Sequence, residues 1–399
     1  MELKQTQLAA SSRLRIVVLG YIVRGPLGGL VWHHLQYVLG LHLLGHEVLF
    51  LEDSDDYPSC YQPDSYEMSS DPTYGLQFIQ QAFAPYGLSD KWAYYDAHEL
   101  RWYGQTSTQV HHFIQSADVL LNLSGVNVLR EPALLQIPQR VLIDTDPAFT
   151  QIRHLSEAPA HTLAARHNHF FTFGENFGLP ECSIPDDGFK WRTTRQPVVL
   201  DLWPQSPGNS SQPWTTVMQW DSYRVREWNQ IQYGMKSASF EPYLDLPQQS
   251  VERFELALGS ASAPRAELSA LGWQLLDPLS VSRSPGDYQS FIARSKGEWS
   301  IAKQGYVASC SGWFSERSAA YLASGRPVVL QDTGFSRFLE AGQGLLAFTT
   351  PQEALTALAE VHAAYARHAE AAREIANTYF EAAKVLRHLL EQVFSTTPL

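Results

Sequence analysis

The sequence predicts an α/β protein built from two domains with parallel sheets. Its 399 residues exceed the length at which a single hydrophobic core usually stops growing, which favours two domains of about 200 residues each. Apolar runs of strand length alternate with amphipathic stretches along nearly the whole chain, and this alternation is typical of parallel α/β layers. The formal net charge of −12 at pH 7 opposes binding to DNA, RNA or anionic lipid, so we expect no nucleic-acid partner.

The first half of the chain accounts for one sheet with its helices. We expect strands at residues 14–21, 47–52, 118–123, 140–144 and 169–173, and helices at 30–44, 73–83, 107–115 and 162–167. The polar stretch 53–71 is predicted to be an exposed loop, which either lines a binding cleft or is a plain surface excursion.

The second half repeats the alternation after a connecting stretch at residues 180–213. That stretch is dense in Pro, Gly, Ser, Asn and Gln, which is typical of a link between domains. Beyond it we expect strands at 215–220, 254–258, 273–276, 299–302, 327–330 and 344–348, and a helix at 285–293. Residues 351–393 are rich in Ala, Glu and Leu and predict two or three consecutive helices.

One segment of the second half, residues 311–335, has the pattern of a phosphate-binding unit. A Ser311–Gly312 turn precedes a predicted helix whose first turn holds Ser315, Glu316, Arg317 and Ser318. The unpaired N–H groups and partial positive charge of a helix start suit a phosphate, and Arg317 adds a cationic contact. The alternative is an ordinary loop, helix and strand of a parallel sheet.

A glycine-rich loop follows the first predicted strand, in the sequence Gly25-Pro26-Leu27-Gly28-Gly29. Open α/β sheets bind ligands at the carboxyl ends of their strands, so this loop either contacts a ligand or is a structural turn. It matches neither the dinucleotide-binding nor the P-loop pattern. Arg24, just before it, is a candidate partner for a phosphate or an acidic ligand.

These two segments resemble those of GT-B glycosyltransferases. The run Ala-Ser-Gly-Arg-Pro-Val-Val at 323–329 is similar to the end of their donor-site helix, and Gly28-Gly29 followed by Gly45-His46-Glu47-Val48 is similar to their opening. The resemblance implies two Rossmann-like domains with a C-terminal helix that crosses back to the first. Residues 1–200 would bind the acceptor, 201–377 the nucleotide-sugar donor, and 378–399 would form the crossing helix.

The resemblance further implies a metal-independent glycosyltransferase that moves a sugar from a nucleotide-diphosphate donor to a small-molecule or glycan acceptor, with no cofactor. Lys303 and Arg317 would stabilise the departing diphosphate, and Glu316 would hold the ribose. The two glutamates of the retaining enzymes are absent, since their positions hold Gly312 and Ala320. The donor-binding residues would be Gly28, Gly29, Lys303, Ser311, Gly312, Glu316, Arg317, Ser318, Asp332, Thr333, Gly334 and Phe335.

The candidate bases lie at helix and strand ends in the first half. Asp144 ends a predicted strand and Asp146 comes two residues later; either carboxylate can bind an acceptor there, and Asp144 can deprotonate it. Asp146 precedes Pro147, so the alternative for Asp146 is a helix cap. His33 and His34 are adjacent in a predicted helix, so at most one faces the cleft, and His33 is the candidate.

Two other functions stay open, a nucleotide-sugar 2-epimerase and a non-catalytic binder of sugar nucleotides. The three cysteines are far apart, which fits a reducing compartment. Residues 1–12 are polar, and no apolar stretch approaches the length of a transmembrane helix, so we expect a cytoplasmic protein without a transmembrane segment.

Overall fold

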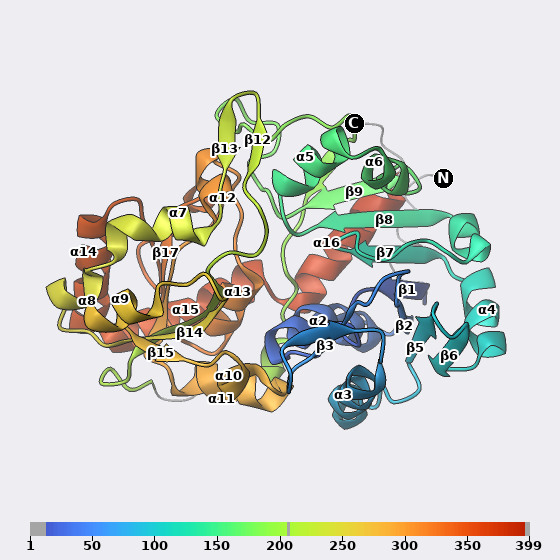
Figure 1. Cartoon of the computed structure of the whole chain (residues 1–399), viewed down its shortest axis with the longest axis horizontal. Coiled ribbons are helices and arrows are strands. Elements are labelled where there is room, and N and C mark those ends of the chain that lie inside the picture. The colour runs from blue at the N-terminus through green and yellow to red at the C-terminus, as the bar shows by residue number, and fades with distance from the viewer. Residues whose placement is uncertain (1–12, 206–207, 396–399) are drawn as a thin grey trace, which may run out of the picture.

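A computed structural model describes residues 13–205 and 208–395, so the prediction for residues 1–12 lies outside the described part. The first sheet has the strand order β10-β9-β8-β7-β1-β2-β5-β6 and is parallel except for β6, which pairs antiparallel with β5 (Figure 1). Its strands are β1 (Arg15–Leu19), β2 (Glu47–Asp53), β5 (Trp92–Asp96), β6 (Arg101–Gly104), β7 (Val119–Leu123), β8 (Gln139–Asp144), β9 (His169–Thr172) and β10 (Trp191–Thr193).

The second sheet is parallel throughout, with the order β15-β14-β11-β16-β17-β18. Its strands are β11 (Trp214–Gln219), β14 (Phe254–Gly259), β15 (Gln274–Leu276), β16 (Gly297–Ser300), β17 (Val328–Gln331) and β18 (Leu345–Phe348). In each sheet the chain starts in the middle, builds one side and then returns to build the other. The order therefore reverses between β1 and β7 and between β11 and β16, which is where open α/β sheets bind ligands.

Helices cover both faces of each sheet, as parallel strands require (Figure 1). Two short hairpins, β3 (Cys60–Gln62) with β4 (Glu67–Ser69) and β12 (Arg226–Trp228) with β13 (Ile231–Tyr233), project from the loops. The first domain carries α2 (Gly28–Leu43), α3 (Thr73–Phe83), α4 (Ser107–Gln115), α5 (Phe149–Ser156) and α6 (Ala158–Ala164). The second half of the chain carries α7 (Lys236–Phe240), α8 (Leu246–Gln249), α9 (Arg265–Ala270), α10 (Leu279–Ser282), α11 (Pro285–Arg294), α12 (Gln304–Ala308), α13 (Glu316–Ala323), α14 (Pro351–Ala363), α15 (Tyr365–Tyr379) and α16 (Ala382–Phe394).

The last helix, α16, packs against α2 of the first domain, as predicted (Figure 1). A Cβ at Gly40 would lie 2.6 Å from Leu386 Cδ1, so glycine lets the two helices approach closely. The other crossing of the chain lies beside this one, because Val198 and Glu381 form a parallel β-bridge. The two domains are therefore tied together at two neighbouring points.

The N-terminus of α2 also touches the second domain directly. A Cβ at Gly28 would lie 2.4 Å from the Ser284 carbonyl oxygen, and one at Gly29 would lie 3.1 Å from the Tyr288 ring. Trp32 Nε1 donates to the Pro285 carbonyl at 3.0 Å. The Gly28-Gly29 pair thus allows α2 to pack against the start of α11, which closes one side of the cleft between the domains.

Candidate functional site

A cavity of about 460 Å³ lies between the two sheets at their carboxyl edges. Residues from both domains line it, and many of them lie at strand ends or in the first turns of helices near the points where the strand order reverses. The lining includes Tyr21, Gly29, His33, Ser124, Thr145, Asp146, Gln219, Tyr223, Lys236, Lys303, Tyr306, Trp313, Ser315, Glu316 and Arg317. We call this space the central cavity.

Lys236 is the lining residue with the most unusual surroundings. It begins α7, directly after the β12–β13 hairpin, and its side chain is buried at 8 % relative exposure. Within the described ranges, its ammonium group has no hydrogen bond or ion pair. Burial lowers the pKa of Lys236 well below its usual value, and the nearby charge of Arg317 lowers it further. Such a site favours an anionic ligand, which would replace the lost solvation of the ammonium group.

Arg317 is held by protein groups on all sides of its guanidinium. Nε donates to Glu298, Nη1 donates to the Val217 carbonyl at 3.0 Å, and Nη2 donates to Ser300 Oγ at 3.1 Å. Glu298 lies on β16 with no exposed side-chain surface. Arg317 therefore neutralises a buried carboxylate, and its expected role as a diphosphate ligand stays a prediction.

The start of α13 faces the central cavity. Ser315 Oγ accepts a hydrogen bond from Arg317 N at 3.2 Å and caps the helix. Glu316 lines the cavity, and burial followed by the Glu316 charge raises the pKa of Tyr21, across the cleft, to about 12. The helix start thus brings both a partial positive charge and a carboxylate to the space between the domains.

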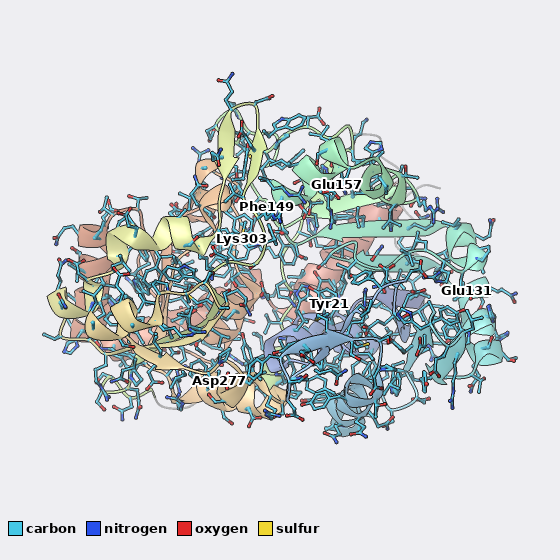
Figure 2. All side chains as sticks on the ribbon, viewed as in Figure 1. Tyr21, Glu131, Phe149, Glu157, Asp277 and Lys303 are labelled. Carbon is cyan, nitrogen blue, oxygen red and sulfur yellow. The ribbon has the colours of Figure 1, made fainter. Side chains whose placement is uncertain are left out.

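Lys303 and Asp146 join the two domains across this cavity. Lys303 Nζ lies 2.9 Å from Asp146 Oδ1 and donates to the Tyr223 hydroxyl at 2.6 Å. Asp146 also accepts hydrogen bonds from the hydroxyls of Tyr223 and Tyr306. Lys303 Nζ also lies 5.0 Å from the centre of the Phe149 ring, and Figure 2 labels both residues. The Asp146 carboxylate thus binds side chains of the second domain. We expected Asp146 either to bind the acceptor or to cap a helix, and this contact between the domains is a further role.

Asp144 is buried and organises the loop that presents Asp146. Its Oδ2 accepts hydrogen bonds from Thr172 Oγ1 at 2.7 Å and Gln151 Nε2 at 3.1 Å, while Oδ1 accepts one from Asp146 N at 2.9 Å. Burial raises the pKa of Asp144, and these hydrogen bonds oppose the rise. Ala148 in the same loop has a φ of 71°, a strained backbone that the Asp144 and Gln151 contacts hold in place.

His33 and His34 point to different environments, as adjacent helical residues must. His34 Nδ1 donates to the Leu30 carbonyl at 2.8 Å and Nε2 accepts from Tyr21 N at 3.3 Å, so both its nitrogens serve the backbone. His33 lines the central cavity. Gln196 Nε2 donates to the carbonyls of His33 and Pro197 at 3.1 and 3.0 Å, which turns Gln196 Oε1 toward His33 Nδ1 at 2.6 Å.

That arrangement fixes the proton of the neutral His33 ring. Because Oε1 of Gln196 only accepts hydrogen bonds, His33 Nδ1 carries the proton and Nε2 has a free lone pair. Burial lowers the pKa of His33, while the Glu316 charge and the Gln196 bond oppose the shift. His33 is therefore neutral near pH 7, and no described side chain hydrogen-bonds its Nε2.

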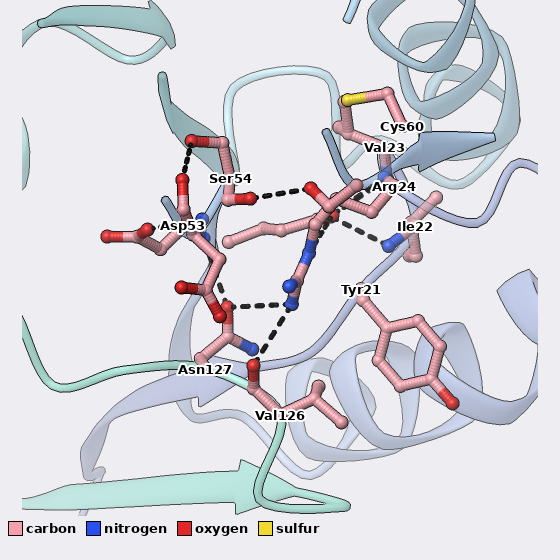
Figure 3. Close-up of polar contacts among 12 residues, drawn as sticks. Tyr21, Ile22, Val23, Arg24, Asp53, Ser54, Cys60, Val126 and Asn127 are labelled. Carbon is pink, nitrogen blue, oxygen red and sulfur yellow. Dashed lines mark hydrogen bonds and ion pairs between the residues drawn. The ribbon is translucent and has the colours of Figure 1, made fainter. Parts of the chain in front are cut away.

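Arg24 does not line the central cavity. It sits against Glu52, whose Oε1 accepts from Arg24 N at 2.7 Å, and whose Oε2 accepts from Ile22 N and Val23 N at 2.7 and 2.8 Å. Arg24 Nη2 donates to the Val126 carbonyl at 3.3 Å (Figure 3). The Glu52 carboxylate therefore occupies the row of N–H groups after β1, the place where a phosphate would otherwise bind in this domain.

Three of the remaining predicted donor residues, Ser311, Gly312 and Gly334, lie at a contact between the domains outside the central cavity. Asn176, after β9, donates from Nδ2 to the Cys310 carbonyl at 2.8 Å and from N to the Ser311 carbonyl at 3.1 Å. A Cβ at Gly312 would lie 2.8 Å from Asn176 N. Of the other predicted donor residues, Ser318, Thr333 and Phe335 are buried, and Asp332 Oδ1 accepts from Gly334 N at 2.7 Å.

Two further cavities extend the central one along the cleft. A cavity of about 820 Å³ lies at the carboxyl ends of β14 and β15 and shares Gln219 with it; we call this the outer cavity. A third, of about 710 Å³, lies in the first domain between the loop after β7 and helices α5 and α6, and shares Ser124 with the central cavity. We call it the first-domain cavity. Each of these two cavities therefore borders the central cavity at one shared residue.

No family model and no curated protein matches this chain. Several solved structures do match in fold. An alpha-glucosyltransferase in complex with UDP-glucose and DNA containing an abasic site aligns with a TM-score of 0.58 at 11% identity, covering 96% of this chain and 100% of that one. HepE of Anabaena, in complex with UDP and glucose, aligns at 0.55 and 12% identity over 96% and 99% of the two chains.

Sucrose-phosphate synthase from Thermosynechococcus elongatus aligns at a TM-score of 0.51 and 12% identity, over 96% of this chain and 100% of that one. In residues 13–205 and 208–395 no helix has the length and apolarity needed to span a bilayer, and no cluster of three His, Cys, Asp or Glu side chains could hold a metal ion. Both Rossmann-type sheets, the return of α16 and these full-length alignments agree. The chain has the GT-B fold.

Proposed function

We propose that this protein is a metal-independent glycosyltransferase that uses a nucleotide-diphosphate sugar. The observation that carries the proposal is Lys236, a buried ammonium group without a partner in the described structure, which faces the central cavity beside the start of α13. A diphosphate supplies the anionic oxygens that both features favour. The UDP and UDP-glucose bound to proteins of the same fold support this choice of donor.

The two cavities that border the central one suggest how the donor lies. The nucleoside lies in the outer cavity, at the ends of β14 and β15. Because Gln219 lines both the outer and the central cavity, the diphosphate of that nucleotide can reach Lys236 in the central cavity. The sugar lies beyond it, toward Tyr21 and His33 of the first domain. In the transition state the bond from the sugar to the diphosphate breaks, and its electron pair stays on the phosphate oxygen. Lys236 and the α13 dipole stabilise that charge.

His33 supplies the base in this scheme. The acceptor hydroxyl attacks the sugar and passes its proton to Nε2 of the neutral ring, while Gln196 holds Nδ1. Besides the expected stabilisation of the departing diphosphate, Lys303 has a second role. Its ion pair with Asp146 holds the two domains together around the reacting groups. Lys236 with the helix dipole takes the place of a divalent ion, so we expect turnover to survive EDTA; loss of activity that Mg²⁺ or Mn²⁺ restores would contradict this.

The acceptor is expected to be a small molecule or glycan and not a nucleic acid. Although a matching structure of the same fold contains DNA, the net charge of −12 opposes such a partner here. The unpaired cysteines Cys60, Cys182 and Cys310 suit activity in the reducing cytoplasm. The first-domain cavity favours a transferase over a 2-epimerase, because an epimerase needs no second substrate.

An activity screen tests the proposal. Purified protein is incubated with UDP-, GDP-, ADP- and dTDP-sugars, with and without a panel of hydroxyl acceptors, and nucleoside diphosphate release is followed while NMR records the sugar. We expect acceptor-dependent release of the nucleoside diphosphate and a new glycoside. An isomerised nucleotide sugar without acceptor would instead identify an epimerase, and tight donor binding without turnover would identify a binding protein.

A further inference from the structure

The first-domain cavity holds a positive charge that the protein itself leaves without a partner. Arg153 on α5 lines this cavity, and within the described ranges its guanidinium makes no hydrogen bond or ion pair. Its Nε is fully buried and unsatisfied. Buried donors of this kind are rare in folded proteins, and a charged one is stabilised strongly by an anionic partner.

The other ionisable groups around the cavity are already engaged. Glu157 forms an ion pair with Arg226 at 2.9 Å, and the Asp144 carboxylate accepts the hydrogen bonds described above. His154 Nδ1 lies 2.7 Å from Asp187 Oδ2. Burial lowers the pKa of His167 to about 4, which leaves that ring neutral.

Two groups nearer the solvent complete this set. Asp55 Oδ1 accepts from Asp56 N at 2.8 Å, and the exposed Arg166 donates from Nη1 to the Leu129 carbonyl at 3.5 Å. Among the ionisable side chains that line the cavity in the described structure, Arg153 is therefore the one whose charged group has no hydrogen-bond or ion-pair partner.

The rest of the wall is mainly apolar, with Val126, Val128, Leu142, Leu163 and Ala164 among its members. Tyr57 adds an aromatic side chain from the stretch 53–71, which the sequence placed either at a cleft or on a plain surface. Ser124 lines both this cavity and the central cavity, so a molecule that binds here and extends past Ser124 brings a hydroxyl toward the donor sugar.

We propose that the first-domain cavity is the acceptor subsite, and that the acceptor is an apolar hydroxyl compound with one carboxylate, which Arg153 binds. A single guanidinium matches a single negative charge, and its planar fork suits the two oxygens of a carboxylate. The proposal rests on the glycosyltransferase function above, and it adds the chemical class of the second substrate.

A matched pair of probes tests it. Calorimetric titrations compare 4-(hydroxymethyl)benzoate with 4-(hydroxymethyl)benzamide, which has the same shape without the charge, in the presence of saturating UDP. The wild type is expected to bind the carboxylate at least about tenfold more tightly, the range of a charge-assisted hydrogen bond. Arg153→Gln should abolish this preference, whereas Arg101→Gln, at an exposed arginine outside the cavity, should keep it.

Absence of any carboxylate preference in the wild type, absence of binding by both probes, or an undiminished preference in Arg153→Gln would each overturn the proposal. Thermal denaturation of both variants checks that they fold. If Arg153→Gln does not fold, the wild-type comparison still decides, and Arg153→Lys provides the second variant, with a weakened but remaining preference expected. UDP is titrated first, so a protein that binds no nucleotide fails the proposed function, while one that binds UDP but not the carboxylate fails only this inference.

Discussion

Replacing Lys236 with methionine should move stability and ligand binding in opposite directions. The ammonium group is buried at 8 % exposure and burial lowers its pKa, so an apolar side chain of similar length removes an unfavourable desolvation. We expect the free energy of unfolding of Lys236→Met without ligand to rise by about 0.5–2 kcal/mol, the range of common stabilising substitutions.

Nucleotide binding should weaken in the same variant. Loss of one charge-assisted contact costs about 1.5–3 kcal/mol, which corresponds to about 10–150-fold in the Kd of UDP. Urea denaturation measures the first effect and calorimetric titration with UDP the second. Equal UDP affinity in the variant and the wild type would refute the assignment of Lys236 to the diphosphate.

Lys296 provides the matched control, because it is also a fully buried lysine but has a partner. Its Nζ lies 2.6 Å from Glu252 Oε1, and Glu252 is itself buried. Lys296→Met removes the ammonium partner of that carboxylate, which keeps His362 Nδ1 at 2.6 Å, and should destabilise the protein by about 1.5–3 kcal/mol. Its UDP affinity, measured at a temperature where the variant is folded, should be unchanged.

The pH dependence follows from the direction of the Lys236 shift. Its folded pKa is lowered, so between that value and the usual pKa of about 10.4 the unfolded chain binds more protons. This group therefore makes the wild type more stable as pH rises through that window, and Lys236→Met should lack the effect. A diphosphate reverses the shift, so UDP binding in that range should take up a proton, which calorimetry in buffers of different ionisation enthalpy detects.

Three other substitutions test separate parts of the structure. Arg317→Met should destabilise the protein by about 3–5 kcal/mol, because it leaves Glu298 charged and buried without its partner. In urea denaturation, the double variant with Glu298→Leu should recover most of that loss. Equal stability of Arg317→Met and the wild type would contradict the importance of the buried ion pair. Gly28→Ala should push α2 away from α11, because the new Cβ would lie 2.4 Å from the Ser284 carbonyl oxygen, and should increase the radius of gyration in small-angle scattering. Gly286→Ala should not, because the nearest atom to its Cβ is 3.8 Å away. His33→Asn should lower kcat by about 10²–10⁴-fold without changing UDP affinity. Since burial lowers the pKa of His33, wild-type kcat/KM should fall only below the usual histidine pKa of about 6.5, and an acidic limb above that value would exclude His33 as the base.

The architecture could be predicted because its signals are local. Apolar runs set the strands, and Ser315, which the sequence predicts in the first turn of its helix, caps the start of α13. The β5 and β6 pair went unpredicted, since the run Trp92–Asp96 is aromatic and buried on both faces and shows no alternation. The predicted helix at 162–167 is wrong in its bounds, because α6 already begins at Ala158.

The site was harder to predict because its side chains meet across the fold. Asp146 binds Lys303, Tyr223 and Tyr306, which lie 157, 77 and 160 positions away in the chain. Nothing near Lys236 in the sequence distinguishes it from an exposed lysine, since its burial depends on how α7 docks. Local patterns located the loops of the cleft, and the long-range packing decided which of their residues line it.

Hydrogen–deuterium exchange with and without UDP tests the central claim most directly, namely that a nucleoside diphosphate binds between the domains beside Lys236. We predict UDP-dependent protection of the backbone at residues 219–223, 234–238 and 315–318. Protection should be absent from the turn at residues 22–24, because its N–H groups already donate hydrogen bonds to the Glu52 carboxylate. Protection at 22–24 without any change at 234–238 and 315–318 would place the nucleotide in the first domain and contradict the account.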